Sequence, residues 1–382
     1  MNIAILLLNQ GRGSGEVARQ HARFLTARGH RVFFLHPRIG QGVPGVENRD
    51  IPLHTDCMPV HEYLPAAKGN QKAVSHMTYD EAMAYLPDYE KALGEVADEV
   101  DLFIGHHANL SAIATARVAR EQGKPYVLFL HGTGIEPRHH GHFDDRVWAL
   151  IEDAIRGAAG LLVTTDYVRD ELVRPLIDVP SERFLVLPCG VDLQAFHPEQ
   201  TSDVRKRYDL PKIFAICPGA LTAVKGPQNV VQASAAYSDL APTIFIGDGE
   251  MRVDLEKQLQ DRGRFLGFVS DEDKSQLINA ATVLVAAPEK KEHFGIIYAE
   301  ALAGGTVPVA YDGGGVGSIV TPEVGRLTER DPARLGAAVR EVLELADDTR
   351  AEMTRTGRAR AEERYDYNQL VAKLERWLAQ AT

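Results

Sequence analysis

The sequence predicts an α/β protein of two domains, each built on a doubly wound parallel sheet. The first indication is length, because 382 residues exceed what one hydrophobic core usually supports. The second is a pattern of strand, glycine loop, helix and strand that occurs in both halves of the chain. The third is the alternation of short apolar runs with helical stretches elsewhere, as a parallel sheet with crossover helices requires.

In the first half, the apolar run Ile3–Leu8 precedes a glycine loop, Gln10–Gly15, and a helical pattern that ends before the second run, Arg31–Leu35. The first run has no basic start and no small-residue cleavage site, so we expect a strand rather than a secretory signal. We expect Gly13 and Gly15 to line a ligand-binding cleft. A dinucleotide cofactor is not favoured, because the spacing misses G-x-G-x-x-G and no ribose-binding acid follows.

In the second half, the run Lys212–Cys217 leads into Pro218-Gly219 and a loop that ends at Lys225-Gly226. Pro227 suits the first position of the next helix, and Thr243–Gly247 is the following strand. Further buried strands are expected at Leu102–Gly105, Tyr126–His131, Leu161–Thr165, Phe184–Pro188, Thr282–Ala287 and Val307–Ala310.

The composition excludes several classes of function. The net charge is −11, spread over both halves, which argues against nucleic acid and against stable docking on anionic lipid. No apolar run is long enough to span a membrane. The three cysteines lack disulfide or zinc spacing and indicate reduced thiols. We therefore expect a soluble, cytoplasmic protein.

A turn-rich, polar stretch places the expected domain boundary near Val191–Pro198. The predicted domains are residues 1–195 and 196–364, with a C-terminal helix at 365–382 that no strand follows. In doubly wound sheets, ligands bind at the loops that follow the carboxyl ends of the strands.

The most informative segment begins at Glu292, in a predicted loop, and reaches Glu300, two turns into a predicted helix. Gly295 would let a ligand approach the backbone closely. The free amides of Ile296 and Ile297 at the helix start would suit a diphosphate. From the residues alone, a capped helix with two surface glutamates explains the pattern equally well.

This segment resembles the E-x7-E motif of retaining family-4 glycosyltransferases, including Phe294-Gly295 inside it. Other segments similar to that family, in the same order, are Arg28–Val32, His131-Gly132, Leu187–Asp192, Phe245–Glu250, Phe265–Val269 and Ala301–Val309. The resemblance covers nearly the whole chain. It implies a GT-B fold, two Rossmann-like domains that face a central cleft, with the donor in the C-terminal domain and the acceptor mostly in the N-terminal one.

Carried over residue by residue, the resemblance implies that Glu292 contacts the donor sugar and that Glu300 contacts the ribose. The amides of Ile296 and Ile297 would hold the diphosphate, with Lys225 beside its charge. The segment around Val269 would border the nucleobase, and His131 would contact the donor sugar. The co-substrate would be a UDP-, GDP- or ADP-sugar, and no cofactor is implied.

One position departs from the family pattern. The loop Gly219–Gly226 has Ala220 where the family has an arginine that shares the diphosphate with the lysine. A contact of that kind is worth about 1.5–3 kcal/mol. Either another basic residue substitutes, for which Arg12 is a candidate, or the leaving group is less stabilised. The substitution also leaves open a catalytically silent relative.

The family is thought to retain configuration by front-face attack, in which the departing phosphate oxygen takes the acceptor's proton. The chain would then position the acceptor and stabilise the leaving diphosphate without a metal ion. The acidic string Asp271–Asp273 follows Ser270 and is interpreted as a capped helix start, not as a metal site.

Residues on the N-terminal side are candidates for contact with a small hydroxylated acceptor. His106, His107 and Asn109 follow a predicted strand, and Arg138 opens a histidine-rich loop. Structural histidines explain the first group equally well, and a metal at the loop is not favoured. A sugar-nucleotide epimerase, a phosphorylase or a clamshell binding protein would share the two-domain layout. The oligomeric state is not predicted.

Overall fold

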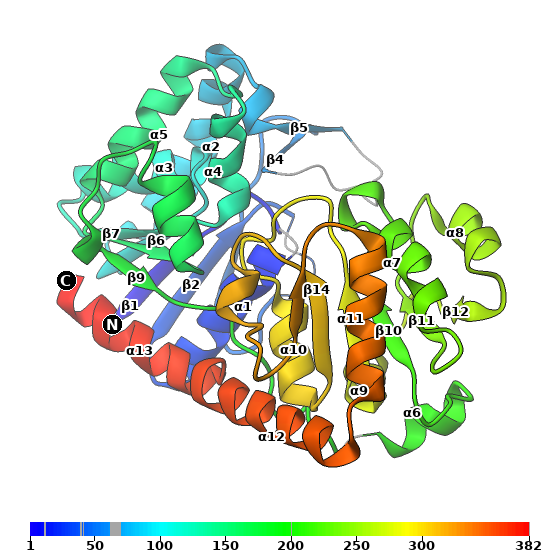
Figure 1. Ribbon diagram of the computed structural model, residues 1–382. Coiled ribbons are helices and arrows are strands. Elements are labelled where there is room, and N and C mark those ends of the chain that lie inside the picture. The colour runs from blue at the N-terminus through cyan, green and yellow to red at the C-terminus, as the bar shows by residue number, and fades with distance from the viewer. Residues whose placement is uncertain (11–12, 39, 41, 62–69, 200, 382) are drawn as a thin grey trace. The chain divides into compact units, whose positions relative to one another are not determined.

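The computed structural model describes residues 1–10, 13–38, 40, 42–61, 70–199 and 201–381, which form two compact units. The first unit contains residues 1–188 and 370–382, and the second contains residues 189–369. The division falls after Pro188, whereas we expected it after residue 195. Each unit is built on one parallel sheet (Figure 1).

The first unit has a seven-stranded parallel sheet in the order β3-β2-β1-β6-β7-β8-β9. The chain runs outward from β1 on one side and then returns to β6 on its other side, so the winding reverses between β1 and β6. Its strands are β1 Asn2–Leu6, β2 Arg31–His36, β3 Glu47–Asp50, β6 Leu102–His106, β7 Tyr126–Phe129, β8 Gly160–Val163 and β9 Phe184–Val186; β4 Met58–Val60 and β5 Gln71–Ala73 form a separate pair.

The helices of the first unit cover this sheet and supply its apolar core. The α-helices are α1 Gly13–Ala27, α2 Tyr79–Ala97, α3 Leu110–Glu121, α4 Gly132–His139 and α5 Asp145–Gly157; shorter helices are η1 Val74–His76, η2 Val168–Val173 and η3 Ser181–Arg183. Helix α2 begins at a capping box, in which Thr78 and Glu81 satisfy each other's backbone amides.

The C-terminal helix α13, Tyr367–Ala381, joins the first unit from residue 370 onward (Figure 1). Glu375 pairs with Arg28 at 2.5 Å and with His30 at 2.9 Å. A Cβ atom added at Gly160 would lie 2.4 Å from the ring of Trp377, so only glycine allows this close approach. The last helix therefore packs against the sheet that the first residues begin.

The second unit has a six-stranded parallel sheet in the order β12-β11-β10-β13-β14-β15. Its winding reverses between β10 and β13, the central neighbours. The strands are β10 Ala215–Pro218, β11 Thr243–Ile246, β12 Gly263–Phe265, β13 Val283–Ala286, β14 Val307–Tyr311 and β15 Arg326–Thr328. The helices are α6 Ser202–Arg207, α7 Pro227–Ala233, α8 Arg252–Leu259, α9 Asp271–Ala280, α10 Ile296–Gly304, α11 Pro332–Glu344 and α12 Asp347–Arg364, with short helices η4 Ala223–Lys225, η5 Ser234–Ala236, η6 Gln260–Arg262 and η7 Val316–Ser318.

Several helix ends are confirmed where the sequence predicts them. Pro227 occupies the first turn of α7, and the side chain of Ser270 accepts a hydrogen bond from the amide of Asp273 at the start of α9. Helix α10 begins after Gly295 and ends at Gly304, followed by Gly305 with a φ of +76°. The sequence thus fixes the helix that carries the two candidate glutamates.

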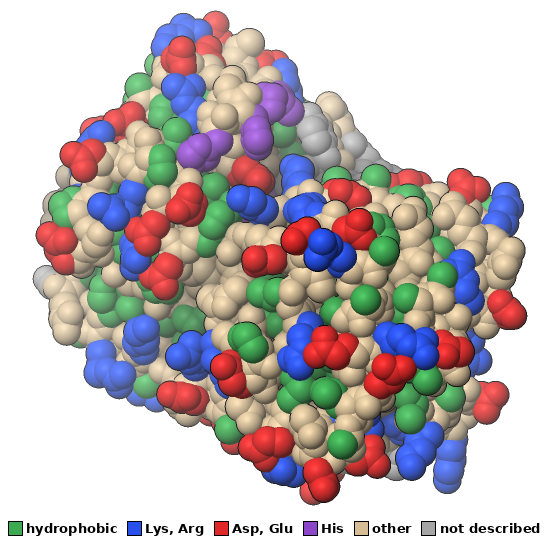
Figure 2. Space-filling model, in the orientation of Figure 1, with side chains coloured by type: hydrophobic (Ala, Val, Ile, Leu, Met, Phe, Trp, Pro, Cys, Tyr) green, Lys and Arg blue, Asp and Glu red, His purple; other side chains and the backbone are tan. Residues whose placement is uncertain are grey.

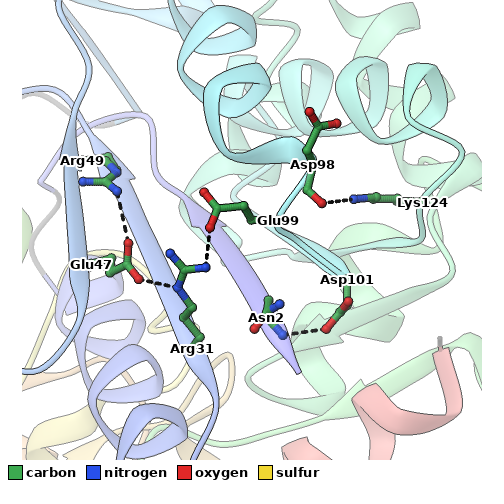
Figure 3. Close-up of polar contacts among 8 residues, drawn as sticks. All are labelled: Asn2, Arg31, Glu47, Arg49, Asp98, Glu99, Asp101 and Lys124. Atoms are coloured by element: carbon green, nitrogen blue, oxygen red, sulfur yellow. Dashed lines mark hydrogen bonds and ion pairs between the residues drawn. The ribbon is translucent and has the colours of Figure 1, made fainter.

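The amino-terminal edge of the first sheet is closed by polar pairs (Figure 3). Arg31 at the start of β2 contacts Glu47 and Glu99, and the amide of Asn2 donates to the carboxylate of Asp101 at 2.7 Å. These side chains satisfy one another at the ends of the strands. Ligands of doubly wound sheets bind at the opposite edge, where the carboxyl ends of the strands lie.

On the face shown in Figure 2, acidic and basic side chains are interspersed rather than segregated. Within the described ranges, no helix combines the length and apolar character needed to cross a bilayer.

Candidate functional site

Lys225 and Glu292 form the centre of the candidate site in the second unit. Lys225 ends the short helix η4 after β10, and Glu292 lies in the loop after β13. Because β10 and β13 flank the point where the winding reverses, their following loops meet at the carboxyl edge of the sheet. The Nζ atom of Lys225 lies 2.9 Å from Oε1 of Glu292, with the side chains 49% and 23% exposed.

The two loops pack against each other at Gly226. This residue has a φ of +64°, and a Cβ atom added to it would lie 1.9 Å from the carbonyl oxygen of Ala287. The amide of Glu289 also donates to the carbonyl of Val224 at 3.0 Å. Glycine is therefore required beside Lys225 for the loops to come this close.

A third loop supports Glu292 from the end of β14. The amide of Gly315 donates to the carbonyl oxygen of Glu292 at 2.7 Å, and Gly314 forms an isolated bridge with the same residue. A Cβ atom at Gly314, whose φ is +68°, would lie 2.2 Å from that oxygen. Our sequence reasoning missed this support, although the run of three glycines after a strand was a visible signal.

The start of α10 lies next to Glu292. Gly295 is the N-cap residue of the helix and has a φ of +88°, so no side chain caps the first amides. The amides of Ile296 and Ile297 stand in the first turn, where helix amides have no partner within the helix and the dipole favours an anion. Phe294 is buried with its ring against Tyr365, 5.8 Å between centroids. This end of α10 is suited to a phosphate group.

Glu300 lies further along α10 and is buried. Its Oε1 atom accepts a hydrogen bond from Nζ of Lys274 on α9 at 2.7 Å. Its Oε2 atom is buried and has no hydrogen-bond partner among the described residues. The sequence did not indicate Lys274, because a lysine in the first turns of a polar helix has no distinctive spacing.

The remaining donor-side candidates line the same edge of the sheet. Gly219, at the end of β10, has a φ of +144° and no other atom within 4 Å of the position of a Cβ. Ala220 beside it is half-buried. After β12, Val269 is half-buried, and the preceding Phe268 is 82% exposed. The described residues therefore leave open space beside Gly219 in the loop after β10.

The first unit brings His106, His107 and His131 together at the carboxyl ends of β6 and β7. Nδ1 of His106 lies 3.0 Å from Nε2 of His131. The ring of His107 lies 4.5 Å from that of His131 and 4.0 Å from that of His61, and Phe129 stacks on His131 at 4.2 Å. Three of the predicted residues thus form one buried aromatic column.

Burial keeps His106 of this column and the nearby His21 neutral. It lowers the pKa of His106 to about 3, with the nearby His21 contributing, and the pKa of His21 to about 4. Nε2 of His106 and Nδ2 of Asn109 are buried and have no hydrogen-bond partner among the residues described. The Oδ1 atom of Asn109 caps α3 by accepting from the amide of Ser111. Unpaired buried polar atoms are costly, and a polar ligand would satisfy them.

The glycine loop after β1 reaches the same column. Nε2 of His107 lies 2.9 Å from Oγ of Ser14 at the start of α1. A Cβ atom at Gly15 would lie 2.0 Å from the carbonyl oxygen of Gln10, whereas Gly13 is exposed and has open space around it. Arg12 lies outside the described residues. The loops after β1 and β6, which flank the reversal in this sheet, therefore meet as their counterparts do in the second unit.

Arg138 makes an ion pair and a cation–π contact with neighbouring residues of the first unit. Its guanidinium pairs with Asp145 at 2.7 Å and lies over the ring of Trp148 at 5.3 Å. In the same segment, Nε2 of His139 lies 2.8 Å from the carbonyl oxygen of Leu172. Throughout the part of the chain that the structure describes, no group of three or more histidine, cysteine or acidic residues is arranged to hold a metal ion.

Comparison with known families identifies both halves of the chain. The model "Glycosyl transferases group 1" matches residues 199–360, and the model "Glycosyl transferase 4-like domain" matches residues 12–190. Among curated proteins, the GDP-mannose-dependent alpha-(1-6)-phosphatidylinositol dimannoside mannosyltransferase of Mycobacterium tuberculosis is 29% identical over 353 residues, 88% of this chain and 84% of the relative. The D-inositol 3-phosphate glycosyltransferase 1 of Catenulispora acidiphila is 29% identical over 315 residues, 76% of this chain and 74% of the relative.

Solved structures agree on the fold. Anabaena HepE, crystallised with UDP, has a TM-score of 0.76 at 18% identity, with 99% of each chain covered. The sucrose-phosphate synthase of Thermosynechococcus elongatus has a TM-score of 0.77 at 19% identity, covering 99% of this chain and 98% of that one. The chain therefore belongs to the family-4 glycosyltransferases, which use nucleotide-sugar donors, and has their GT-B fold of two Rossmann-like domains.

Proposed function

We propose that this chain is a retaining hexosyltransferase that transfers a hexose from a UDP-, GDP- or ADP-sugar to a hydroxyl group of a small acceptor, without a metal ion. The observation that carries the proposal is the pair of Lys225 and Glu292 beside the start of α10. A cation, a carboxylate and free helix amides at a switch point match the diphosphate and sugar of one ligand.

In this proposal the diphosphate lies between Lys225 and the amides of Ile296 and Ile297. Glu292 accepts hydrogen bonds from hydroxyl groups of the sugar, Glu300 contacts the ribose, and the backbone near Val269 borders the base. An ion pair as exposed as that of Lys225 and Glu292 is worth at most about 1 kcal/mol. A nucleotide sugar can therefore take over both partners at little cost.

The chemical step needs no protein nucleophile in this scheme. The acceptor oxygen attacks the anomeric carbon from the face that the diphosphate leaves, and a phosphate oxygen takes the acceptor's proton. Lys225 and the α10 amides stabilise the charge that develops on the leaving diphosphate. That fixed positive potential supplies the stabilisation for which a divalent ion is otherwise used.

The first unit supplies the acceptor-binding residues in this proposal. His106, His107 and Asn109 are candidates. Polar atoms of His106 and Asn109 are buried at the carboxyl edge of the sheet and have no hydrogen-bond partner in the part of the chain that the structure describes. His131, in contact with His106, is proposed to contact the transferred sugar. A hydroxylated ligand can both donate to and accept from such groups.

The two curated relatives name different acceptors, a phosphatidylinositol dimannoside and an inositol phosphate, and the first names GDP-mannose as donor. HepE was solved with UDP and with UDP-glucose. GDP-mannose and UDP-glucose are therefore the first donors to test here.

The proposal is tested by a thermal-shift screen of UDP-, GDP- and ADP-hexoses followed by an assay for nucleoside diphosphate release. A ligand at 100 times its dissociation constant adds about 2.7 kcal/mol to the free energy of unfolding. We expect one donor to raise the melting temperature and to be hydrolysed slowly without acceptor. Stabilisation without any release, with every acceptor tried, would favour the silent relative that Ala220 suggests.

A further inference from the structure

The side chain of Glu289 joins the two loops that carry Lys225 and Glu292. Glu289 lies in the loop after β13, three residues before Glu292. Its Oε1 atom accepts hydrogen bonds from Nδ2 of Asn229 at 2.7 Å and from Nε2 of Gln228 at 3.0 Å. Both donors stand in the first turn of α7, three and four residues after Lys225. One carboxylate oxygen therefore links the loop of Glu292 to the chain that follows Lys225.

The backbone of Glu289 contacts the other side of the same lysine. Its amide donates to the carbonyl oxygen of Val224 at 3.0 Å, and Val224 directly precedes Lys225. The contacts of Glu289 thus reach the chain both before and after Lys225. Hydrogen bonds of this kind around a site fix the positions of the side chains within it.

The residues that precede Glu289 are held as well. Nδ2 of Asn229 also donates to the carbonyl oxygen of Ala287 at 3.2 Å, and Nη2 of Arg330, after β15, donates to the carbonyl oxygen of Pro288 at 2.6 Å. The same guanidinium lies 3.9 Å from Oε2 of Glu289, with the side chains 36% and 48% exposed. An ion pair at this distance and exposure adds little stability. The loop is therefore held by hydrogen bonds, and Glu289 acts in it as an acceptor rather than as a charge.

The stability of the second unit does not account for this arrangement. A polar side chain that is about half exposed contributes little to the free energy of unfolding. The rate of a reaction is far more sensitive to position, because a displacement of about 1 Å can lower it about a hundredfold. The network around Glu289 is therefore best explained by the alignment of the two groups that its loops carry.

We propose that Glu289 is a positioning residue, which fixes the loop of Glu292 against the loop of Lys225 and so places the Glu292 carboxylate for the transfer step. Glu289 itself does not touch the donor. This inference rests on the proposed function, because it concerns the same donor site. Since Glu289 acts through Glu292, its removal should matter only while Glu292 is present.

The test measures kcat and KM for hydrolysis of the nucleotide sugar that stabilises the protein. We expect Glu289→Ala to lower kcat about tenfold, because the alignment needed in the transition state is lost. KM should change less than about threefold, since the amides of α10 still bind the ground state. Glu289→Gln should restore most of the turnover, because its amide oxygen can accept from the same two side chains.

A double-mutant cycle separates positioning from a general structural role. In the Glu292→Ala background, Glu289→Ala should lower kcat less than about twofold, because the group that it positions is already absent. Glu341→Ala removes an exposed carboxylate paired with Arg326, and as the matched control it should leave kcat and KM unchanged. Should Glu289→Ala fail to fold, Gln228→Ala, which removes one of the two donors, takes its place in the cycle. The same loss of effect in the Glu292→Ala background is then expected.

Equal losses of kcat with and without Glu292 would overturn the inference and leave Glu289 as a structural link between loops. Wild-type kcat in Glu289→Ala, or a Glu289→Gln variant as impaired as Glu289→Ala, would overturn it as well. An active wild type whose kcat is unchanged by Glu292→Ala would overturn the role of Glu292, and this inference with it. A wild type that hydrolyses none of the nucleotide sugars would overturn the proposed function itself.

Discussion

Nζ of Lys225 lies 2.9 Å from Oε1 of Glu292, so the group proposed for the diphosphate and the group proposed for the sugar hold each other. The lysine side chain is about half exposed, so the pair is weak in free energy but defines the position of both groups. Close backbone approaches at Gly226 and Gly314 hold the loops that carry the two residues. The geometry therefore places a cation and a carboxylate close enough to contact adjoining parts of one donor.

Glu292→Gln should separate the two roles of this pair. We expect turnover to fall at least about a hundredfold, because a focused electrostatic contact to the sugar is lost. The affinity for the nucleoside diphosphate should not fall, because Lys225 no longer shares its charge with a carboxylate. Turnover and calorimetric affinity are measured side by side, with Glu341→Gln from the exposed pair with Arg326 as control. Equal losses of turnover and diphosphate affinity would show that Glu292 does not act on the sugar.

Lys225→Met should lower both the affinity for the nucleoside diphosphate and the turnover. Loss of one hydrogen bond to a charged group costs about 1.5–3 kcal/mol, which corresponds to about tenfold or more in affinity. Circular dichroism and the melting temperature check that the fold is kept, with Lys257→Met as the matched lysine control. Near-wild-type affinity in Lys225→Met would remove this lysine from the diphosphate site.

Ala220→Arg tests whether the family arginine has been lost without replacement. Ala220 is half-buried next to Gly219, around which the described residues leave open space. We expect the new guanidinium to raise the affinity for the nucleoside diphosphate about tenfold, which corresponds to about 1.4 kcal/mol. The gain should shrink as salt is added, because the contact is screened. A weaker complex at low salt would instead indicate that another basic group already occupies this space.

Activity should survive a chelator. In the proposal, Lys225 and the amides of Ile296 and Ile297 stabilise the leaving diphosphate without a bridging ion. Turnover is measured after dialysis against EDTA, with and without added magnesium or manganese. Complete loss of turnover, restored by either ion, would show that a metal takes part in the reaction.

The stability of the first unit should fall as pH drops below about 6.5. Burial lowers the pKa of His21 to about 4, so the unfolded chain binds a proton at a higher pH than the folded one does. His21 thus contributes up to about 3 kcal/mol, present in full above pH 6.5 and lost between about pH 6.5 and 4. His21→Phe should reduce the fall in melting temperature over this range, because phenylalanine can stack on Phe129 without titrating. A part of the fall should remain, because burial also lowers the pKa of His106, to about 3. His140→Gln, a substitution of an exposed histidine, serves as the control and should leave the pH dependence of the melting temperature unchanged. An unchanged pH profile in His21→Phe would contradict this origin.

Much of the fold could be predicted from the sequence because its local signals are strong. The buried strands are apolar runs, and Asp331 and Ser270 accept hydrogen bonds from the first amides of their helices, as their residue types indicate. Strand β3, Glu47–Asp50, was missed because an exposed edge strand of polar residues has no apolar run. The domain boundary was placed late because the polar stretch near Pro198 lies within the second unit.

The candidate site was predictable only in part. The segment from Glu292 to Glu300 has a distinctive spacing, and Lys225 follows a glycine loop, so both could be proposed. The contact of Lys274 with Glu300 depends on how α9 packs on α10, and the support of Glu292 by Gly315 depends on the order of the strands. Contacts of this kind are set by tertiary packing, which no local pattern reports.

Retaining transfer at the Lys225–Glu292 site is the central claim, and the anomer of the hydrolysed sugar tests it most directly without any known acceptor. The nucleotide sugar that stabilises the protein is incubated with enzyme, and proton NMR follows the first free sugar before it mutarotates. The account predicts that the released sugar first has the anomeric configuration of the donor, and that Glu292→Gln releases it at least about a hundredfold more slowly. Initial release of the opposite anomer would contradict the account.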